Sequence, residues 1–351
     1  MNLIEVLNTI RDNASQEYQD RIPEATRDNL ESIRYAMIDG DNIMVANEFM
    51  QTLLNKLVKQ VVHTKLFTNP LKGLKSGTKP LGDTVEEIYN NFLKGETHDK
   101  SGDVSKLIGR NLPDTKTVYH RMNYQMQYPV TVSREQLSKA FMSYDALESY
   151  ITNIINQLYN SAELDEYKNT IELMESAINK KAVKIIDIAD PLGGEQAGKD
   201  FIKAVKTISG KMVFPSTQFN GYLDAQTTDK KPITTFSRKD EQVLILDTET
   251  DVAVSVDVLA SLFNMSVAEF NDTKKIVVDT LPSTEDGGIV RAMLVDKGFF
   301  QIFDDLFNIT SFYNGQSLYT NYFLNVWQTQ AYSILVNAVA FVCPATQTTE
   351  A

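Results

Sequence analysis

The clearest pattern in the chain is an alternation of apolar and polar residues between Val118 and Val132. Apart from His120, every second residue from Val118 onward is apolar, and most residues between them are polar. This period of two predicts a β-strand with one buried face. Pro129 cannot donate a backbone hydrogen bond, which predicts an edge strand or a bulge. A single strand of this length would span about 50 Å at about 3.3 Å per residue, roughly the width of a compact molecule of this size.

A second, shorter alternating segment, Thr84 to Leu93, is the predicted partner of that strand. The residues between the two arms, Gly95 to Asp114, are rich in Gly, Asp and Lys and form the predicted tip. An isolated two-stranded hairpin is marginally stable in water. We therefore expect the hairpin to lie on another surface, and we expect that surface to belong to a neighbouring copy.

Helical spacing of apolar residues predicts helices on both sides of this hairpin. Before it we expect one helix from Leu3, a second that opens at Pro23 and stops at Asp39-Gly40-Asp41, and a third over Val45 to Val62. After it, Ser133 and Gln136 have the spacing of a capping box and predict a short helix to about Phe141.

A longer helix is predicted over Asp145 to Ile178. It carries two apolar stripes on different faces, with the change near Ser161, so we expect its two ends to have different partners. The first stripe predicts a helix core of four residues, namely Leu147, Ile151, Ile154 and Leu158.

Strands and helices alternate over residues 199–282, which predicts a compact α/β lobe. The expected strands are 242–246, 276–278 and 289–295, and the expected helices are 256–263 and 267–270. The last section, Phe299 to Val342, is rich in aromatic residues and Asn and predicts long strands that return to the first core.

Composition narrows the classes of protein. The 34 Lys and Arg against 46 Asp and Glu give a net charge of −12, which argues against a protein that grips nucleic acid through clustered positive charge. A single cysteine, Cys343, excludes a disulfide framework. The longest weakly polar run, Ala331 to Cys343, is too short to span a bilayer. Glu5 and Arg11 interrupt the first apolar stretch, so we expect no secretory leader.

Chemical motifs are weak throughout. The Gly-rich segment inside Asp187 to Gly198 lacks phosphate-loop spacing and is interpreted as a linker. His98, beside acidic residues in the hairpin tip, has too few potential partners for a metal site. Acidic groups at 86–87, 163–166 and 304–305 could in principle do acid–base chemistry, but 46 carboxylates produce such groups by chance. We expect no catalytic residue, cofactor or metal.

The order of elements resembles that of the major capsid proteins of tailed bacteriophages with the Hong Kong-97-type fold, most closely those of small short-tailed phages. The resemblance rests on residues 111–178, which open with NLPDTKTVYHRMNYQMQYPVTVSREQ, on AVSVDVLASLFNMSVAEFNDTKKIVVDTLP at 253–282, and on 289–342. In that family a long hairpin, the extension loop, precedes a long spine helix.

The resemblance implies an α+β fold with extension hairpin, spine helix, peripheral domain and axial domain. The expected segments are an N-terminal helical arm (1–65), the extension loop (66–132), a peripheral domain with the spine helix (133–198), an axial domain (199–285) and C-terminal strands of the peripheral domain (286–351). Some members join subunits by a Lys–Asn bond, and no residue here is assigned that role. Inter-subunit contacts are expected at Val85, Ile88, Phe92, His98, Arg110, Tyr119, Arg121, Met122, Tyr124 and Met126.

The function so implied is a non-enzymatic head protein that assembles in the host cytoplasm, as hexamers and pentamers, into an icosahedral shell of the virion. Its expected partners are further copies of itself, a portal and, as a further candidate, a scaffolding protein. The enclosed double-stranded DNA is not bound in a sequence-specific way, and no membrane is involved. Two alternatives remain: an encapsulin-like nanocompartment shell protein and, more remotely, an acidic cytosolic hydrolase.

Overall fold

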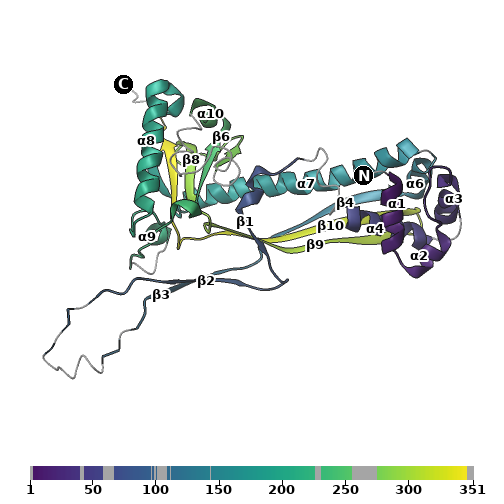
Figure 1. Ribbon diagram of the computed structural model, residues 1–351, viewed down its shortest axis with the longest axis horizontal. Helices are drawn as coiled ribbons and strands as arrows, with labels where there is room; N and C mark the ends of the chain where they lie inside the picture. The colour runs from purple at the N-terminus through teal and green to yellow at the C-terminus, as the bar shows by residue number, and fades with distance from the viewer. Residues whose placement is uncertain are drawn as a thin grey trace. The chain divides into compact units, whose positions relative to one another are not determined.

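The computed structural model describes residues 3–39, 43–57, 67–95, 97–98, 100, 109–110, 112–142, 144–225, 231–254 and 275–345. The chain divides into two compact units. The first unit consists of Met1–Asn69, Tyr124–Glu166 and Asp304–Gln328. The second consists of Pro70–Asn123, Tyr167–Phe303 and Thr329–Ala351. Three long elements contribute to both units, namely helix α7 (Tyr144–Asn179) and strands β9 (Phe300–Asn314) and β10 (Tyr319–Tyr332) (Figure 1).

The N-terminal helices of the first unit are α1 (Leu3–Asn13), α2 (Gln16–Arg21), α3 (Leu30–Arg34), which continues as a π-helix (Tyr35–Asp39), and α4 (Ile43–Leu57). The prediction of a helix opening at Pro23 is wrong, because α3 begins only at Leu30. The side chain of Asn29 accepts from the Thr26 N–H at 2.8 Å and donates to the Glu24 carbonyl at 2.7 Å. These local bonds offer the backbone an alternative to the helix. The predicted stop at Gly40 and the segment 58–62 lie outside the described residues.

A sheet forms the other layer of the first unit. Strand β4 (Tyr124–Ser133) pairs antiparallel with β10. In the strand order β1-β9-β10-β4, the first unit contributes β4 and most of β9 and β10, whereas β1 (Lys75–Thr78) belongs to the second unit. Helix α7 lies on one face of this sheet, with the Tyr128 hydroxyl donating to Asp165 at 3.0 Å. The short helix α6 (Arg134–Ala140) follows β4 with the predicted capping box of Ser133 and Gln136. Pro129 lies in β4 at the sheet edge, which confirms the edge-strand prediction.

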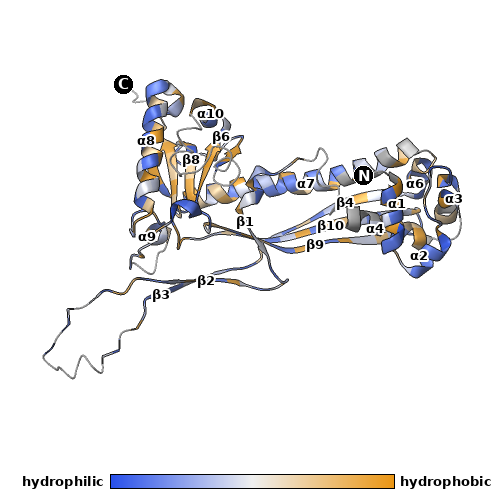
Figure 2. Cartoon of the chain, viewed as in Figure 1, coloured by the Kyte–Doolittle hydropathy of each residue, from blue (hydrophilic) through white to orange (hydrophobic). Residues whose placement is uncertain are grey.

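The second unit is built on a five-stranded sheet in the order β5-β11-β8-β6-β7. One face packs on helix α8 (Glu195–Met212) through Phe201 and Val205, and the other packs on the last turns of α7 through Met174 and Ile178. Figure 2 shows the apolar strands beside the amphipathic helix α8. The strands are β5 (Lys184–Asp187), β6 (Gln242–Asp247), β7 (Lys275–Val278), β8 (Ile289–Asp296) and β11 (Ala338–Cys343).

Short elements complete the second unit. They are the 3-10 helices Pro70–Leu74, Pro191–Gly193 and Lys239–Glu241, helices α9 (Tyr222–Ala225) and α10 (Thr248–Ala253), and strands β2 (Val85–Asn90) and β3 (Thr115–His120).

The structure bears out several predictions. The two stripes of α7 do face different cores, since its first half contributes to the core of the first unit and its last turns to that of the second. The strands predicted near 242, 276 and 289 are present as β6, β7 and β8, and the aromatic C-terminal section forms β9, β10 and β11. The helices predicted at 256–263 and 267–270 lie outside the described residues.

Two predictions need correction. The alternating segment Val118 to Val132 is not one strand, because residues 121–123 separate β3, which pairs with β2, from β4, which pairs with β10. The segment Asp187 to Gly198 is not a plain linker. It follows the end of β5, contains a 3-10 helix and includes the start of α8 at Glu195. The five-stranded sheet also takes strands from three predicted segments, 133–198, 199–285 and 286–351.

Candidate inter-subunit surface

The β2–β3 hairpin has two chemically different faces. Its strands pair antiparallel from Val85 opposite His120 to Asn90 opposite Thr115. Alternation places Val85, Glu87, Tyr89, Lys116, Val118 and His120 on the inner face, which is half-buried or buried. The outer face carries Glu86, Ile88, Asn90, Thr115, Thr117 and Tyr119, all of them exposed.

The inner face lies on residues of the same unit. The Tyr89 hydroxyl donates to the Thr234 carbonyl, and the Lys116 ammonium lies 5.9 Å from the ring centre of Tyr222. His120 Nε2 lies 2.8 Å from Glu87 Oε2, so the most buried end of the hairpin is fastened by a hydrogen bond across its own strands.

Beyond β2 the attachment continues through one asparagine. The Asn91 amide donates to the Pro232 carbonyl at 3.1 Å, and its oxygen accepts from the Thr234 N–H at 3.2 Å. The expectation that the hairpin needs a neighbouring copy for support is therefore wrong for its base. A preorganised base leaves less conformational entropy to lose when the outer face meets a partner.

The outer face exposes large apolar side chains. Ile88 is 60% exposed and Tyr119 is 61% exposed, and Phe92 beyond the strand end is 55% exposed. The Tyr119 hydroxyl donates to Glu86 Oε1 at 2.9 Å, and this hydrogen bond raises the pKa of Tyr119. The hydroxyl of Thr115 donates to Asn90 at 2.7 Å. These cross-strand bonds fix side chains on the exposed face without covering Ile88.

The predicted contact residues fall in several places. Ile88 and Tyr119 share the outer face of the hairpin, whereas Val85 is on the inner face. Phe92 lies beyond β2, with its ring centre 6.3 Å from that of Phe236. Four others are outside the paired strands, with His98, Arg110 and Arg121 exposed and Met122 half-buried. Tyr124 and Met126 are not hairpin residues at all, because they belong to β4.

Two exposed apolar residues near the tip were missed. Leu93 is 80% exposed and Leu112 is 81% exposed. Leu93 directly follows Phe92, and Leu112 lies between Asn111 and Pro113, so no periodicity marks either residue as surface or core. The rest of the tip lies largely outside the described residues.

Three of the four residues predicted for the spine-helix core are buried in the structure. Leu147 is 0% exposed, Leu158 3% and Ile154 6%, all in the core of the first unit. The side chain of Ile151 lies outside the described part of the chain.

A buried ionic network lies in the second unit. Arg291 on β8 contacts Asp247 at 3.0 Å, Glu249 at 2.9 Å and Asp190 at 3.1 Å. Burial lowers the pKa of Arg291, but hydrogen bonds to these three carboxylates outweigh it and raise the pKa overall. Burial raises the pKa of Asp190, but the hydrogen bonds from Arg291 and from the Leu192 N–H, together with the charge of Arg291, outweigh burial and lower the pKa overall. The network joins β8 to the N-cap of α10, where Asp247 accepts from Thr250 N–H.

Among the acidic groups considered for acid–base chemistry, Glu166 and Asp304 converge on one amide, since both accept from Gln328 Nε2, at 2.8 Å and 2.7 Å. Glu86 and Glu87 lie on opposite faces of the hairpin. Glu166 is 8% exposed and accepts hydrogen bonds from Asn69 and Gln328. Within the residues the structure describes, no group of three or more His, Cys, Asp or Glu is arranged to hold a metal ion. Over the same residues, no helix combines the length and apolarity needed to cross a bilayer.

Two solved structures of phage particles have the same fold over most of this chain. The capsid structure of Staphylococcus phage Andhra matches 80% of this chain and 85% of that chain with a TM-score of 0.64 at 14% identity. A structure of head fiber and inner core protein of native bacteriophage P68 matches 79% of this chain and 85% of that chain with a TM-score of 0.58 at 12% identity. The fold is that of a phage capsid protein of the Hong Kong-97 type, as the resemblance implied.

Sequence comparison supplies the family. The profile of the Phi29-like phage major capsid protein family matches residues 7–342. The major capsid protein of Bacillus phage PZA is 32% identical over 338 residues, which cover 96% of this chain and 72% of that protein. The major capsid protein of Bacillus phage GA-1 is 34% identical over 299 residues, which cover 84% of this chain and 60% of that protein. The chain belongs to the Phi29-like family of phage major capsid proteins, and it is a structural component of the virion. The nanocompartment and hydrolase alternatives gain no support.

Proposed function

We propose that this chain assembles as hexamers and pentamers into an icosahedral shell that encloses double-stranded DNA, and that the outer face of the β2–β3 hairpin is a contact between subunits. The observation that carries the proposal is the difference between the two hairpin faces. The inner face is held on the same chain, while Ile88 and Tyr119 face solvent on a rigid base. Exposed aromatic and aliphatic anchors of this kind are typical of interface centres.

The proposed mechanism is mechanical and has no catalytic step. Residues 66–132 act as the extension loop and 133–198 carry the spine helix, flanked by the N-terminal arm (1–65). The axial domain (199–285) closes the rings, and residues 286–351 complete the peripheral domain. The net charge of −12 suits a wall that encloses DNA without sequence-specific binding. A portal is a further proposed partner, and a scaffolding protein is another.

The test is the substitution Ile88→Asp. Because Ile88 is exposed in the subunit, we expect the variant to fold, with a change in the free energy of unfolding within about 0.5 kcal/mol. In a shell, the carboxylate would be buried without a partner, so closed particles should be reduced about tenfold or more. The measurement is sedimentation velocity together with negative-stain electron microscopy.

Ile289→Asp is the matched control, since Ile289 is 45% exposed at the start of β8. It places the same charge elsewhere on the second unit and should leave particle yield unchanged. Normal particles from Ile88→Asp would contradict the assignment of the hairpin face.

A further inference from the structure

The turn between β9 and β10 contains a strained apolar residue. Leu318 has φ +51°, one of two non-glycine residues with positive φ in the described chain. An L-residue in this region is disfavoured by contact of its Cβ with the backbone, and Gly or Asn is usual. Leu318 is also 47% exposed. Strain of this kind, together with an exposed apolar side chain, points to a function outside the isolated subunit.

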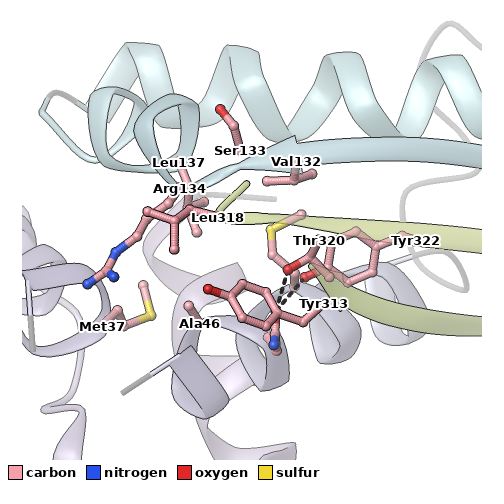
Figure 3. Close-up of a pocket in the computed structure, with 12 residues that line it drawn as sticks. Met37, Ala46, Val132, Ser133, Arg134, Leu137, Tyr313, Leu318, Thr320 and Tyr322 are labelled. Atoms are coloured by element: carbon pink, nitrogen blue, oxygen red, sulfur yellow. Dashed lines mark hydrogen bonds between the residues drawn. The ribbon is translucent and has the colours of Figure 1, made fainter. Parts of the chain in front are cut away.

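The surrounding contacts fix the turn in this conformation. The Asn314 side-chain oxygen accepts from the N–H groups of Gln316 at 3.0 Å and Ser317 at 3.3 Å. The Leu318 carbonyl accepts from the Arg134 N–H at 3.2 Å, which ties the turn to the start of α6. Figure 3 shows Leu318 among the residues that line a small cavity, together with Met37 and Tyr313.

The sheet face that leads to this turn has no charged residue. It is the face of the first unit opposite helix α7, formed by alternate positions 125–131 of β4, 308–312 of β9 and 321–327 of β10. Hydrogen bonds among neutral side chains run across it. Gln127 donates to Asn325 at 2.8 Å, Asn325 donates to Thr310 at 3.2 Å, and Thr131 donates to Asn321 at 2.7 Å.

This composition departs from that of the whole chain. Charged residues make up 23% of the sequence, yet none occupies these positions. Phe312 stands at the β9 edge of the face and is 65% exposed. Depletion of charge combined with exposed aromatic residues is the signature of an interface core.

We propose that this uncharged sheet face and the Leu318 turn form a second contact surface, occupied by another copy of this chain. The inference rests on the proposed shell function. It adds a contact that lies outside the extension hairpin and belongs to the first unit. A second copy is the favoured occupant because members of this family are shell subunits, so other copies are present at high local concentration. A neutral amide-rich face also carries no charge that would repel an identical acidic subunit.

The first test relieves the strain. Leu318→Gly should leave the subunit folded, with its Tm within about 4 °C of the wild type. It should raise the protein concentration needed for particle formation about tenfold or more, because the apolar contact is lost. Lys181→Gly is the matched control, since Lys181 has φ +58° in an exposed position after α7. It relieves the same kind of strain and should not change assembly.

The second test introduces a charge. Phe312→Lys should fold normally and reduce assembly to a similar extent, whereas Phe214→Lys, at a residue 69% exposed after α8, should not. In wild-type particles, hydroxyl-radical footprinting should show protection of Phe312 and Leu318 relative to free subunits. Assembly of both Leu318→Gly and Phe312→Lys at wild-type concentrations, with no protection, would overturn the proposal.

The outcome separates this inference from the proposed function. If the wild type forms shells that Ile88→Asp abolishes but Phe312→Lys does not, the hairpin contact stands and only the second surface fails. If the wild type forms no shell at any concentration or with any added phage component, both proposals fail.

Discussion

At the scale of single residues, the most consequential side chain in the second unit is Arg291. Its side chain is 8% exposed and that of Asp247 is 4% exposed, so both charges are removed from water and depend on each other. A buried pair adds little net stability as a whole, but loss of one partner leaves the other charge uncompensated. The network thus holds β8, α10 and the residue before Pro191 in one arrangement.

Arg291→Met is expected to lower the free energy of unfolding by roughly 3–5 kcal/mol. Urea denaturation followed by circular dichroism measures this. Arg238→Met is the control, because Arg238 pairs with Glu241 at 2.6 Å but its side chain is 63% exposed. A solvent-exposed pair contributes at most about 1 kcal/mol. Equal losses in the two variants would contradict the importance of burial.

The same network predicts an acid dependence of stability. The hydrogen bond from Arg291 lowers the pKa of Asp190 in the folded state. The stability that this lowered pKa contributes is therefore present above the unfolded pKa of about 3.9. That contribution is lost as pH falls through the lowered folded pKa. Between pH 5 and pH 3, a window of about one unit on either side of the unfolded pKa, the Arg291→Met variant should lose less stability than the wild type. A larger acid loss in the variant would refute this account.

Sequence alone could not predict this network. Arg291 and Asp190 are 101 residues apart in the chain, and Arg291 and Asp247 are 44 apart. Each is one charged residue among many, and only the pairing of β8 with β6 brings Arg291 beside Asp247. The exposed face of the hairpin was more accessible to prediction. Alternation identified Ile88 and Tyr119 as strand residues, but it could not tell which face would pack on the same chain.

At the scale of elements, α7 is the clearest success of sequence analysis. The apolar stripes predicted a helix over Asp145 to Ile178, and the helix observed is Tyr144–Asn179. Helical periodicity is a local signal, so it can be recognised without knowing which elements the helix packs on. Strand pairing is not local. The alternation continues through residues 121–123 without a Gly or Pro, so nothing in the pattern marks the change from β3 to β4.

Helix α7 also carries a direct test of the first core. Ile154→Asp should lower the free energy of unfolding by more than about 3 kcal/mol, because an unpaired carboxylate would enter a core position that is 6% exposed. Thr152→Asp, two residues away and exposed, should change it by less than about 0.5 kcal/mol. Thermal unfolding of both variants measures the difference. A soluble, assembly-competent Ile154→Asp protein would show that this stripe is not core.

At the scale of the whole molecule, the hydrophobic cores are complete within the subunit, whereas two of its surfaces have the composition of an interface. The cores of both units are closed by α7, the sheets and the N-terminal helices. The outer face of the hairpin is exposed, and the uncharged sheet face is exposed along β4 and β9 but half-buried or buried along β10. We expect a subunit of this kind to fold alone and to gain its remaining contacts on assembly.

Removal of the hairpin tip tests this division between folding and assembly. Deletion of residues 96–112 should leave a soluble folded subunit, because β2 and β3 are anchored through Tyr89 and Asn91 at the base. The same deletion should prevent stable shells, as seen by sedimentation and electron microscopy. Shells of normal size and yield would contradict the role of the tip.

The most direct test of the shell account is cryo-electron microscopy of particles formed by the full chain. If the hairpin is a contact between subunits, the particles are closed shells of repeated subunits in which Ile88 and Tyr119 of each hairpin are buried against a neighbouring copy. Closed shells in which both side chains face solvent, with subunits joined only through other surfaces, would contradict it.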